Sequence, residues 1–289
     1  MKKNNLIYSI LIGVLFLNSG CEMNANVTVP STERKLVVGG FLSPKENEHQ
    51  ISLSQTDPLF STDPPISLAN VKLTISSDSI SYSPSYDLNS GTFQFNNNQF
   101  NIVHGKNYHL KIVTEDGKMV ESDMRTLSNQ MPSIEEFNIN VDTVFSDFSN
   151  QLIYNLKLTW KDIAGEKNNY RLTANRIFKY SSIPDTTFEP IEEYNSFTLK
   201  DDLGKDGQTL SATIKFEDNS QISETIGFEI LLMKVDVNYY NYYKTLNNYA
   251  DGDPFAEPVI LFSNIQNGLG VFCNYQTIKL RRNLFFKIP

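Results

Sequence analysis

The chain has 289 residues, with 33 acidic against 25 basic side chains and a formal net charge of −8. This balance argues against a nucleic-acid partner, which needs a basic patch to release counterions, and against a helix lying on anionic lipid. Only two cysteines are present, Cys21 and Cys273. If Cys21 is modified, no internal disulfide remains, so a packed core must hold the fold, and the chain is long enough to build one.

The first 21 residues indicate export and lipid attachment. Two lysines precede an apolar run from Leu6 to Leu17, and two small residues stand directly before Cys21. The run is shorter than the roughly 20 residues that cross a bilayer and suits the core of a signal peptide. We expect residues 1–20 to be a lipoprotein signal peptide, Cys21 to carry acyl chains such as palmitate, and residues 21–34 to form an extended tether. An ordinary secretory signal with an incidental cysteine is the alternative, since Asn18 departs from the lipobox pattern.

Residues 35–127 have the pattern of an antiparallel β-sandwich of the immunoglobulin-like or prealbumin-like kind. Apolar and polar residues alternate, as at Val71, Leu73 and Ile75, and turn signals recur every 8 to 15 residues or so. We expect about seven strands here. The Pro-rich segment 57–65 is expected to be a loop, because proline cannot sit in a central strand.

A larger β domain is expected over residues 134–289, after a linker at 128–133. Its clearest strand is 151–161, which ends near Trp160, and we expect 170–180 to be its partner strand. A strand ending in Trp, a short polar loop and a Tyr-led strand resemble a fibronectin-type sandwich. The sheet is expected to continue through residues 209–216 and 226–235, and to end with a strand at 271–278.

One tyrosine-rich helix is expected near 237–249. Asp236 can cap it, and one face repeats at three- and four-residue steps through Tyr239, Tyr242, Tyr243, Leu246 and Tyr249. This face would either pack on the sheet, which we favour, or stack on a sugar. Tyr240 lies off the stripe and is a candidate for an exposed binding contact. Phe60, in the Pro-rich loop, is a second candidate binding aromatic.

The acidic segment 202–207 is the candidate for a metal site. Its spacing resembles the start of a calcium loop, with Asp202 and Asp206 as oxygen ligands, but the third position lacks Asp or Asn and the twelfth is Thr213 rather than Glu. A turn before the next strand is the alternative. The spacing of His104 and His109 does not suit zinc. Neither a nucleophile elbow nor a phosphate-binding glycine loop occurs, so we expect no catalytic residue and no cofactor.

Several segments together resemble a known family. They are the lipobox cysteine, the strand KLVVGGFLSP, a helix with Tyr-Tyr-x-Tyr-Tyr, and PFAEPVILFSNIQNGLGVF near the C-terminus. Together they are similar to the lipoproteins of domain-of-unknown-function family 4249 (DUF4249) of Bacteroidota. The most specific matches are Phe255, Glu257, Pro258, Asn264, Ile265, Asn267, Gly268, Gly270 and Phe272.

The resemblance implies an outer-membrane lipoprotein that often accompanies a TonB-dependent receptor, and it implies no catalytic residue. We therefore expect a non-catalytic accessory of an uptake system, which binds the receptor or its substrate and is anchored through Cys21 at the cell surface or the periplasmic face. The expected partners are the membrane and an outer-membrane protein, without nucleic acid. A glycan-binding or adhesive surface module is the alternative, and a hydrolase with an unfamiliar site is a third hypothesis.

Overall fold

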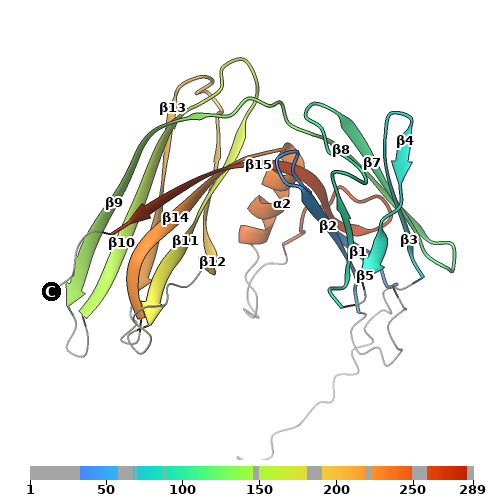
Figure 1. The fold of residues 1–289 in the computed structure, drawn as a ribbon, viewed down its shortest axis with the longest axis horizontal. Coiled ribbons are helices and arrows are strands. Elements are labelled where there is room, and N and C mark those ends of the chain that lie inside the picture. The colour runs from blue at the N-terminus through green and yellow to red at the C-terminus, as the bar shows by residue number, and fades with distance from the viewer. Residues whose placement is uncertain are drawn as a thin grey trace, which may run out of the picture. The chain divides into compact units, whose positions relative to one another are not determined.

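The structure is a computed structural model that describes residues 33–57, 68, 70–87, 89–145, 150–180, 191–218, 223–248 and 259–284. The predicted signal peptide, Cys21 and Phe60 lie outside these residues, as does the 255–258 part of the C-terminal motif. Arg34–Thr56 and Asp63–Pro289 together form one compact unit. Its described residues are mainly β-strands with one helix, and its strands form β-sandwiches, which confirms the predicted fold class (Figure 1).

The first part of the chain forms β1 (Leu36–Leu42), β2 (Glu48–Gln55), β3 (Lys72–Ser77), β4 (Ile80–Tyr82), β5 (Ser85–Asp87), β6 (Thr92–Asn96), β7 (Asn107–Val113) and β8 (Met119–Arg125). The second part forms β9 (Ser133–Phe145), β10 (Asn150–Lys161), β11 (Asn169–Tyr180), β12 (Ile191–Asp201), β13 (Thr209–Asp218), β14 (Ser223–Val235), helix α2 (Val237–Asn247) and β15 (Leu269–Asn283). The described part of 35–127 therefore holds eight strands, where the alternation predicted about seven.

The longest sheet has eight strands in the order β12-β11-β14-β15-β1-β2-β6-β5. Strand β15 lies in its middle and pairs with two partners in succession. Its first residues run parallel to β1, from Leu269 opposite Val37 to Asn274 opposite Leu42. Its later residues run antiparallel to β14, from Tyr275 opposite Val235 onward. Residues from the end of the chain thus complete a sheet that its first strands begin, and the parallel pair departs from the purely antiparallel N-terminal sandwich predicted.

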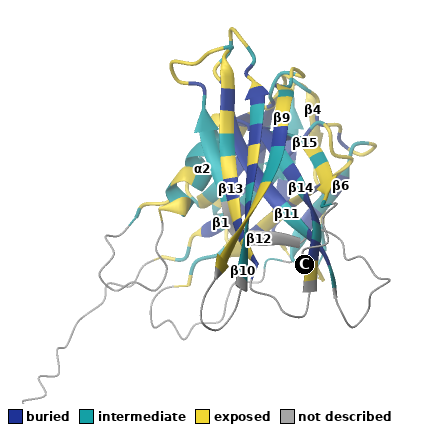
Figure 2. Cartoon of the chain, turned by 90° about the vertical axis from the view of Figure 1, so that its left-hand side faces the viewer, coloured by how far each residue is buried: buried dark blue, intermediate teal, exposed yellow. Residues whose placement is uncertain are grey.

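Smaller sheets cover the inner face of this long sheet, and each encloses its own core. The sheet β4-β3-β7-β8 packs on the β1–β2–β6 part around apolar side chains such as Ile51, Ile75 and Phe93. The sheet β13-β10-β9 packs on the β11–β14 part around side chains such as Leu158 and Phe228. Buried and exposed residues alternate along the covering strands, as β13 shows in Figure 2. This period of two is the reason that the strands could be predicted.

Strands β10 and β11 do not pair, so the prediction that they are sheet partners is wrong. β10 pairs with β9 and β13, and β11 pairs with β12 and β14. They face each other across the core, where the Trp160 and Tyr170 rings meet edge to face with centroids 5.5 Å apart. Both strands are amphipathic with aromatic inner faces, and this pattern is the same for neighbours in one sheet and for strands in facing sheets.

The C-terminal family motif shapes the start of β15. The Asn264 side chain accepts a hydrogen bond from the Phe272 backbone N–H (2.9 Å) and donates to the Phe272 carbonyl (2.8 Å). Gly270 has φ +103°, and a Cβ at this position would lie 2.0 Å from the Val38 carbonyl oxygen. Only glycine permits this approach of β15 to β1. The motif that carries the family resemblance therefore has a folding role.

A buried polar cluster holds the predicted linker 128–133. The Lys234 side chain is only 2% exposed. Its ammonium lies 2.5 Å from Glu166 Oε1 and donates to Ser128 Oγ at 3.0 Å. Gln276 Nε2 donates to the Ser128 carbonyl at 2.7 Å. A buried charge is tolerated only when it is paired and hydrogen-bonded, so these contacts fix the path of the chain from β8 to β9.

Candidate functional site

The tyrosine-rich helix forms where it was predicted and packs on the sheet, as we favoured. Asp236 is its N-cap and accepts the Tyr239 backbone N–H at 2.8 Å. The Tyr239 ring is 2% exposed and meets the Phe41 ring of β1 edge to face, with centroids 5.7 Å apart. Tyr242 and Tyr243 pack in the same cluster. The helix therefore covers part of the outer face of the eight-stranded sheet.

Tyr240 is half-buried rather than exposed. Its hydroxyl donates to Asp201 Oδ2 at 3.0 Å, and the Lys244 ammonium lies 5.7 Å from its ring centroid. Burial first, and then the bond to the Asp201 carboxylate, raise the pKa of Tyr240. The ring is engaged by the protein itself, which makes Tyr240 a poorer binding aromatic than its position off the stripe indicated.

A pocket of about 260 Å³ lies beside this helix, on the outer face of the sheet. In β11, Leu172 and Ala174 point into the core, so the odd-numbered residues face outward toward the pocket. The same alternation places odd-numbered residues of β14 and β15 in the lining. The lining residues are Phe41, Glu46, Arg171, Thr173, Asn175, Leu231, Met233, Tyr239, Tyr243, Tyr275, Thr277 and Lys279.

Arg171 forms the end of the pocket under the helix. Its guanidinium lies 4.7 Å from the Phe197 ring centroid and 4.6 Å from that of Tyr243. One of its nitrogens donates to the Tyr239 hydroxyl at 3.1 Å. Stacking between two rings holds a planar cation in one orientation, so the positive charge here is positioned before any ligand arrives.

The opposite end of the pocket is polar and open to solvent. Thr277 and Lys279 are neighbours on the outward face of β15, and Asn175 lies on β11. Lys279 is exposed. Glu46 is the acidic residue in the lining. The pocket thus combines an aromatic wall, a row of hydroxyl and amide groups, and two cations, which is a composition suited to binding a small polar ligand.

No single stretch of sequence pointed to this pocket. Its residues come from β1, the turn after β1, β11, β14, α2 and β15, and β11, β14 and β15 each contribute only alternate positions. The available signal was the outward row of polar residues at 171, 173 and 175, opposite an apolar inward row. Such a row ordinarily marks a solvated strand face, and only the packing of α2 onto the sheet turns it into a pocket wall.

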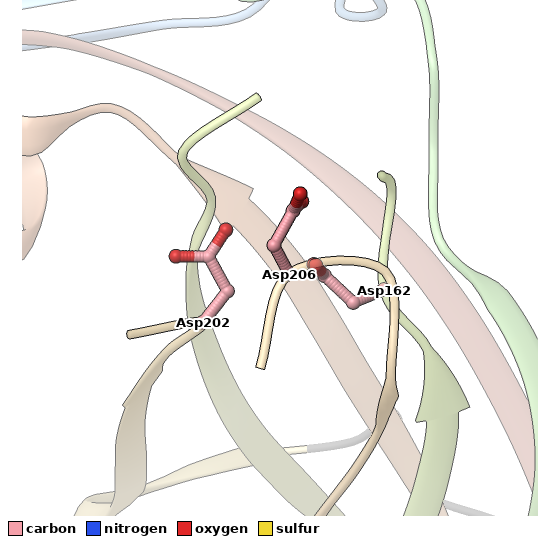
Figure 3. Close-up of side chains that lie close together, drawn as sticks. All are labelled: Asp162, Asp202 and Asp206. Carbon is pink, nitrogen blue, oxygen red and sulfur yellow. The ribbon is translucent and has the colours of Figure 1, made fainter. Parts of the chain in front are cut away.

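The candidate metal ligands Asp202 and Asp206 do come together, and Asp162 joins them (Figure 3). One oxygen from each carboxylate lies within 4.8 Å of the others. Asp162 follows β10, and the other two belong to the segment between β12 and β13. Carboxylates at this spacing could share a calcium ion, whose ligands are oxygens.

Hydrogen bonds give these carboxylates a role that needs no cation. Asp202 accepts the Asn168 backbone N–H at 2.7 Å, and Asp206 accepts that of Gly165 at 2.9 Å. Asp162 accepts the Gly207 N–H at 2.8 Å and the Tyr170 hydroxyl at 2.6 Å.

Gly207 shows how closely these two loops approach. It has φ +63°, and a Cβ there would lie 2.7 Å from the Ala164 Cβ. The aspartates therefore fasten the loop after β10 to the loop before β13, which agrees with the turn interpretation of residues 202–207.

The fold and the pocket define a mainly β protein with sandwich cores and a ligand-sized pocket outside them. The chain belongs to the family described as domain of unknown function (DUF4249), whose profile matches residues 23–281. No curated protein matches the chain. Among the described residues, no helix has the length and apolar character needed to cross a membrane.

Proposed function

We propose that this protein is a non-catalytic lipoprotein of the outer membrane, anchored through Cys21, that serves a TonB-dependent uptake system by binding the receptor's substrate. The predicted signal peptide and the resemblance to the lipoproteins of this family support the location and the receptor partner. Family membership adds no chemistry of its own, so the pocket carries the argument for binding.

The composition of the pocket is the observation that favours binding over catalysis. Among the described residues, its lining has no serine, cysteine or histidine, the side chains that most often act as nucleophile or general base. Aromatic and aliphatic side chains alternate with a few polar groups that converge on one space, which is the usual make-up of a ligand site. Arg171 is already oriented by its two ring contacts, and such preorganisation lowers the cost of binding.

Affinity purification from native membranes tests this proposal. A tag at the C-terminus leaves the predicted lipid anchor intact, and mass spectrometry of the eluate should recover a TonB-dependent receptor enriched over a tagged, unrelated lipoprotein. A Cys21→Ser variant should lose palmitate labelling and leave the membrane fraction. Repeated purifications with no receptor above the control level would refute the receptor partnership.

A glycan-binding or adhesive surface module is the second candidate, and the aromatic and hydroxyl side chains of the pocket favour it. The two candidates differ in what deletion of the gene does. An uptake accessory should be needed for growth on the receptor's substrate, whereas an adhesive module should be needed for attachment and dispensable for that growth. Protease treatment of intact cells shows on which face of the outer membrane the protein lies. An adhesive module must lie on the cell surface, so added protease should cleave it.

A further inference from the structure

We propose that the pocket beside α2 binds a sugar ring that carries a carboxylate, such as the terminal uronic acid of an acidic glycan. This inference rests on the proposed function to the extent that the pocket is a ligand site, and it adds the chemical class of the ligand. Three features of the lining carry it: an aromatic wall, an unsatisfied amide, and an exposed cation.

The aromatic wall suits a six-membered ring with one apolar face. The half-buried rings of Tyr243 and Tyr275 face the pocket. Tyr239 is only 2% exposed and supports Tyr243 by stacking on it, with centroids 4.6 Å apart. Phe41 completes the wall. Tyrosine offers an apolar ring together with a hydroxyl, which matches a sugar, whose C–H face is apolar and whose edges carry hydroxyls. A purely apolar ligand would leave the polar groups below unpaired.

The floor contains an acceptor that lacks a partner. Asn175 Oδ1 is buried and has no hydrogen-bond partner among the described residues, while Asn175 Nδ2 lies 3.5 Å from Glu229 Oε2. A buried amide oxygen without a donor is uncommon and costs stability. The hydroxyl of Thr277 faces the same pocket. A ligand hydroxyl that donates to Asn175 would satisfy this acceptor.

The lining contains two cations although the chain as a whole is acidic. The whole protein carries −8, but the described lining of the pocket has Arg171 and Lys279 against the single acid Glu46. Arg171 lies under the helix, and Lys279 stands exposed at the other end. An anionic group entering from solvent would meet Lys279 first, with Thr277 beside it on the same strand face.

The size of the pocket limits the ligand to about one ring. Its volume of about 260 Å³ lies just below the common range for ligand cavities, roughly 300 to 1,000 Å³. A single uronic acid, or the end of a longer chain that continues into solvent beside Lys279, fits this volume.

Calorimetric titration of the purified full-length lipoprotein in detergent tests the inference. The probes are D-galacturonate and its methyl ester, which share one ring and differ in the charge of the carboxyl group. We expect galacturonate to bind about fivefold more tightly than the ester, the ratio that an exposed ion pair supplies. Equal binding of the two probes, or binding of neither, would overturn the proposal.

Two lysine variants locate the effect. Lys279→Met should remove the preference for galacturonate over the ester, because the methylenes remain and the charge is lost. Lys157→Met is the matched control, since Lys157 is also an exposed strand lysine but lies on β10 in a different sheet. If Lys279→Met kept the preference, Lys279 would not be the group that binds the carboxylate, and if Lys157→Met lost it equally, the effect would not come from the pocket; either result overturns the proposal.

The same variants separate this inference from the proposed function. Membranes that carry the Lys279→Met protein should still yield the receptor on affinity purification. Recovery of the receptor without any galacturonate binding by the wild-type protein would reject the ligand class and leave the uptake role standing. Galacturonate binding without the receptor would reject the uptake role and keep the ligand class.

Discussion

The acidic cluster and the pocket both contain charged side chains at strand ends or on strand faces. In the cluster these side chains bind the protein's own backbone, whereas in the pocket polar groups are left for a ligand. In the cluster, Asp162, Asp202 and Asp206 each accept backbone N–H groups of the opposite loop. In the pocket, Lys279 is exposed and Asn175 Oδ1 has no partner among the described residues. A polar group already bound by its own chain stabilises the fold, whereas one left facing a cavity is available to a ligand.

The largest effect should come from removing Asp162, the carboxylate of the cluster that accepts the buried Tyr170 hydroxyl. Asp162→Ala leaves the buried Tyr170 hydroxyl and the Gly207 N–H without their acceptor. The loss of two hydrogen bonds to a carboxylate, one of which leaves the Tyr170 hydroxyl buried and one the Gly207 N–H half-buried, should lower the free energy of unfolding by about 3 kcal/mol. Urea denaturation measures this value, and ligand binding in the pocket should be unchanged.

Asp206→Ala is the control for this prediction. Asp206 is exposed, so water can replace it as the acceptor for the Gly165 N–H, and the cost should stay below about 1 kcal/mol. If both substitutions cost the same, the cluster would not act through its buried hydrogen bonds, and the contrast with the pocket would fail.

The next effect is a pH dependence from Asp236, the carboxylate that joins α2 to β15. It accepts the backbone N–H groups of Tyr239 and Asn274, both at 2.8 Å. Burial nevertheless raises the pKa of Asp236 from 3.8 to about 6. The folded chain therefore keeps a proton that the unfolded chain releases at lower pH. This proton binding contributes to the free energy of unfolding. Its contribution is complete below pH 3.8 and is lost as the pH rises through about 6.

An Asp236→Asn variant isolates this dependence, because asparagine also caps helices and does not titrate. The free energy of unfolding of the wild type, relative to the variant, should fall by about 2 kcal/mol between about pH 4 and pH 7. Chemical denaturation at several pH values measures the difference. A difference that stays constant with pH would show that Asp236 has the same pKa in the folded and unfolded chains.

The sequence predicted features that depend on neighbouring residues. Alternation identified the strands, and Asp236 with the tyrosine spacing identified the helix. The pairing of β15 with β1 could not be predicted, since Phe272 and Gly40 meet only in the folded chain. Asp162 was missed for the same reason, because it is far from Asp202 in sequence and joins it through the loop contacts.

The pocket was the hardest feature to predict, and its residues show why. Arg171, Asn175 and Thr277 each have the polar character of an ordinary solvated strand face. Their shared role depends on which strands are neighbours and on where α2 packs. Neither is encoded in a local pattern, and the predicted pairing of β10 with β11 would have placed Arg171 beside the wrong strand.

A smaller stability effect should follow from replacing Arg171, because two of its contacts are ring faces. Arg171→Met keeps much of the volume but loses the cation–π contacts to Phe197 and Tyr243 and the bond to Tyr239. We expect a loss of about 1–2 kcal/mol in the free energy of unfolding, measured by urea denaturation. A loss as large as that of Asp162→Ala would make Arg171 a structural residue like the cluster, and would weaken its assignment to the pocket.

Replacing Thr277 should have the smallest effect on stability and a clear effect on ligand binding. Thr277→Val keeps the shape and the β-branched character of the side chain on β15, so the free energy of unfolding should change by less than about 0.5 kcal/mol. Loss of a hydroxyl that faces the ligand should weaken galacturonate binding severalfold, the worth of one neutral hydrogen bond of about 1 kcal/mol. Thr159→Val on β10 makes the same change outside the pocket and should leave the titration unaltered. The pocket differs from the acidic cluster if it contains a group that contributes to binding but not to folding. Equal galacturonate affinities for the two threonine variants would refute this difference.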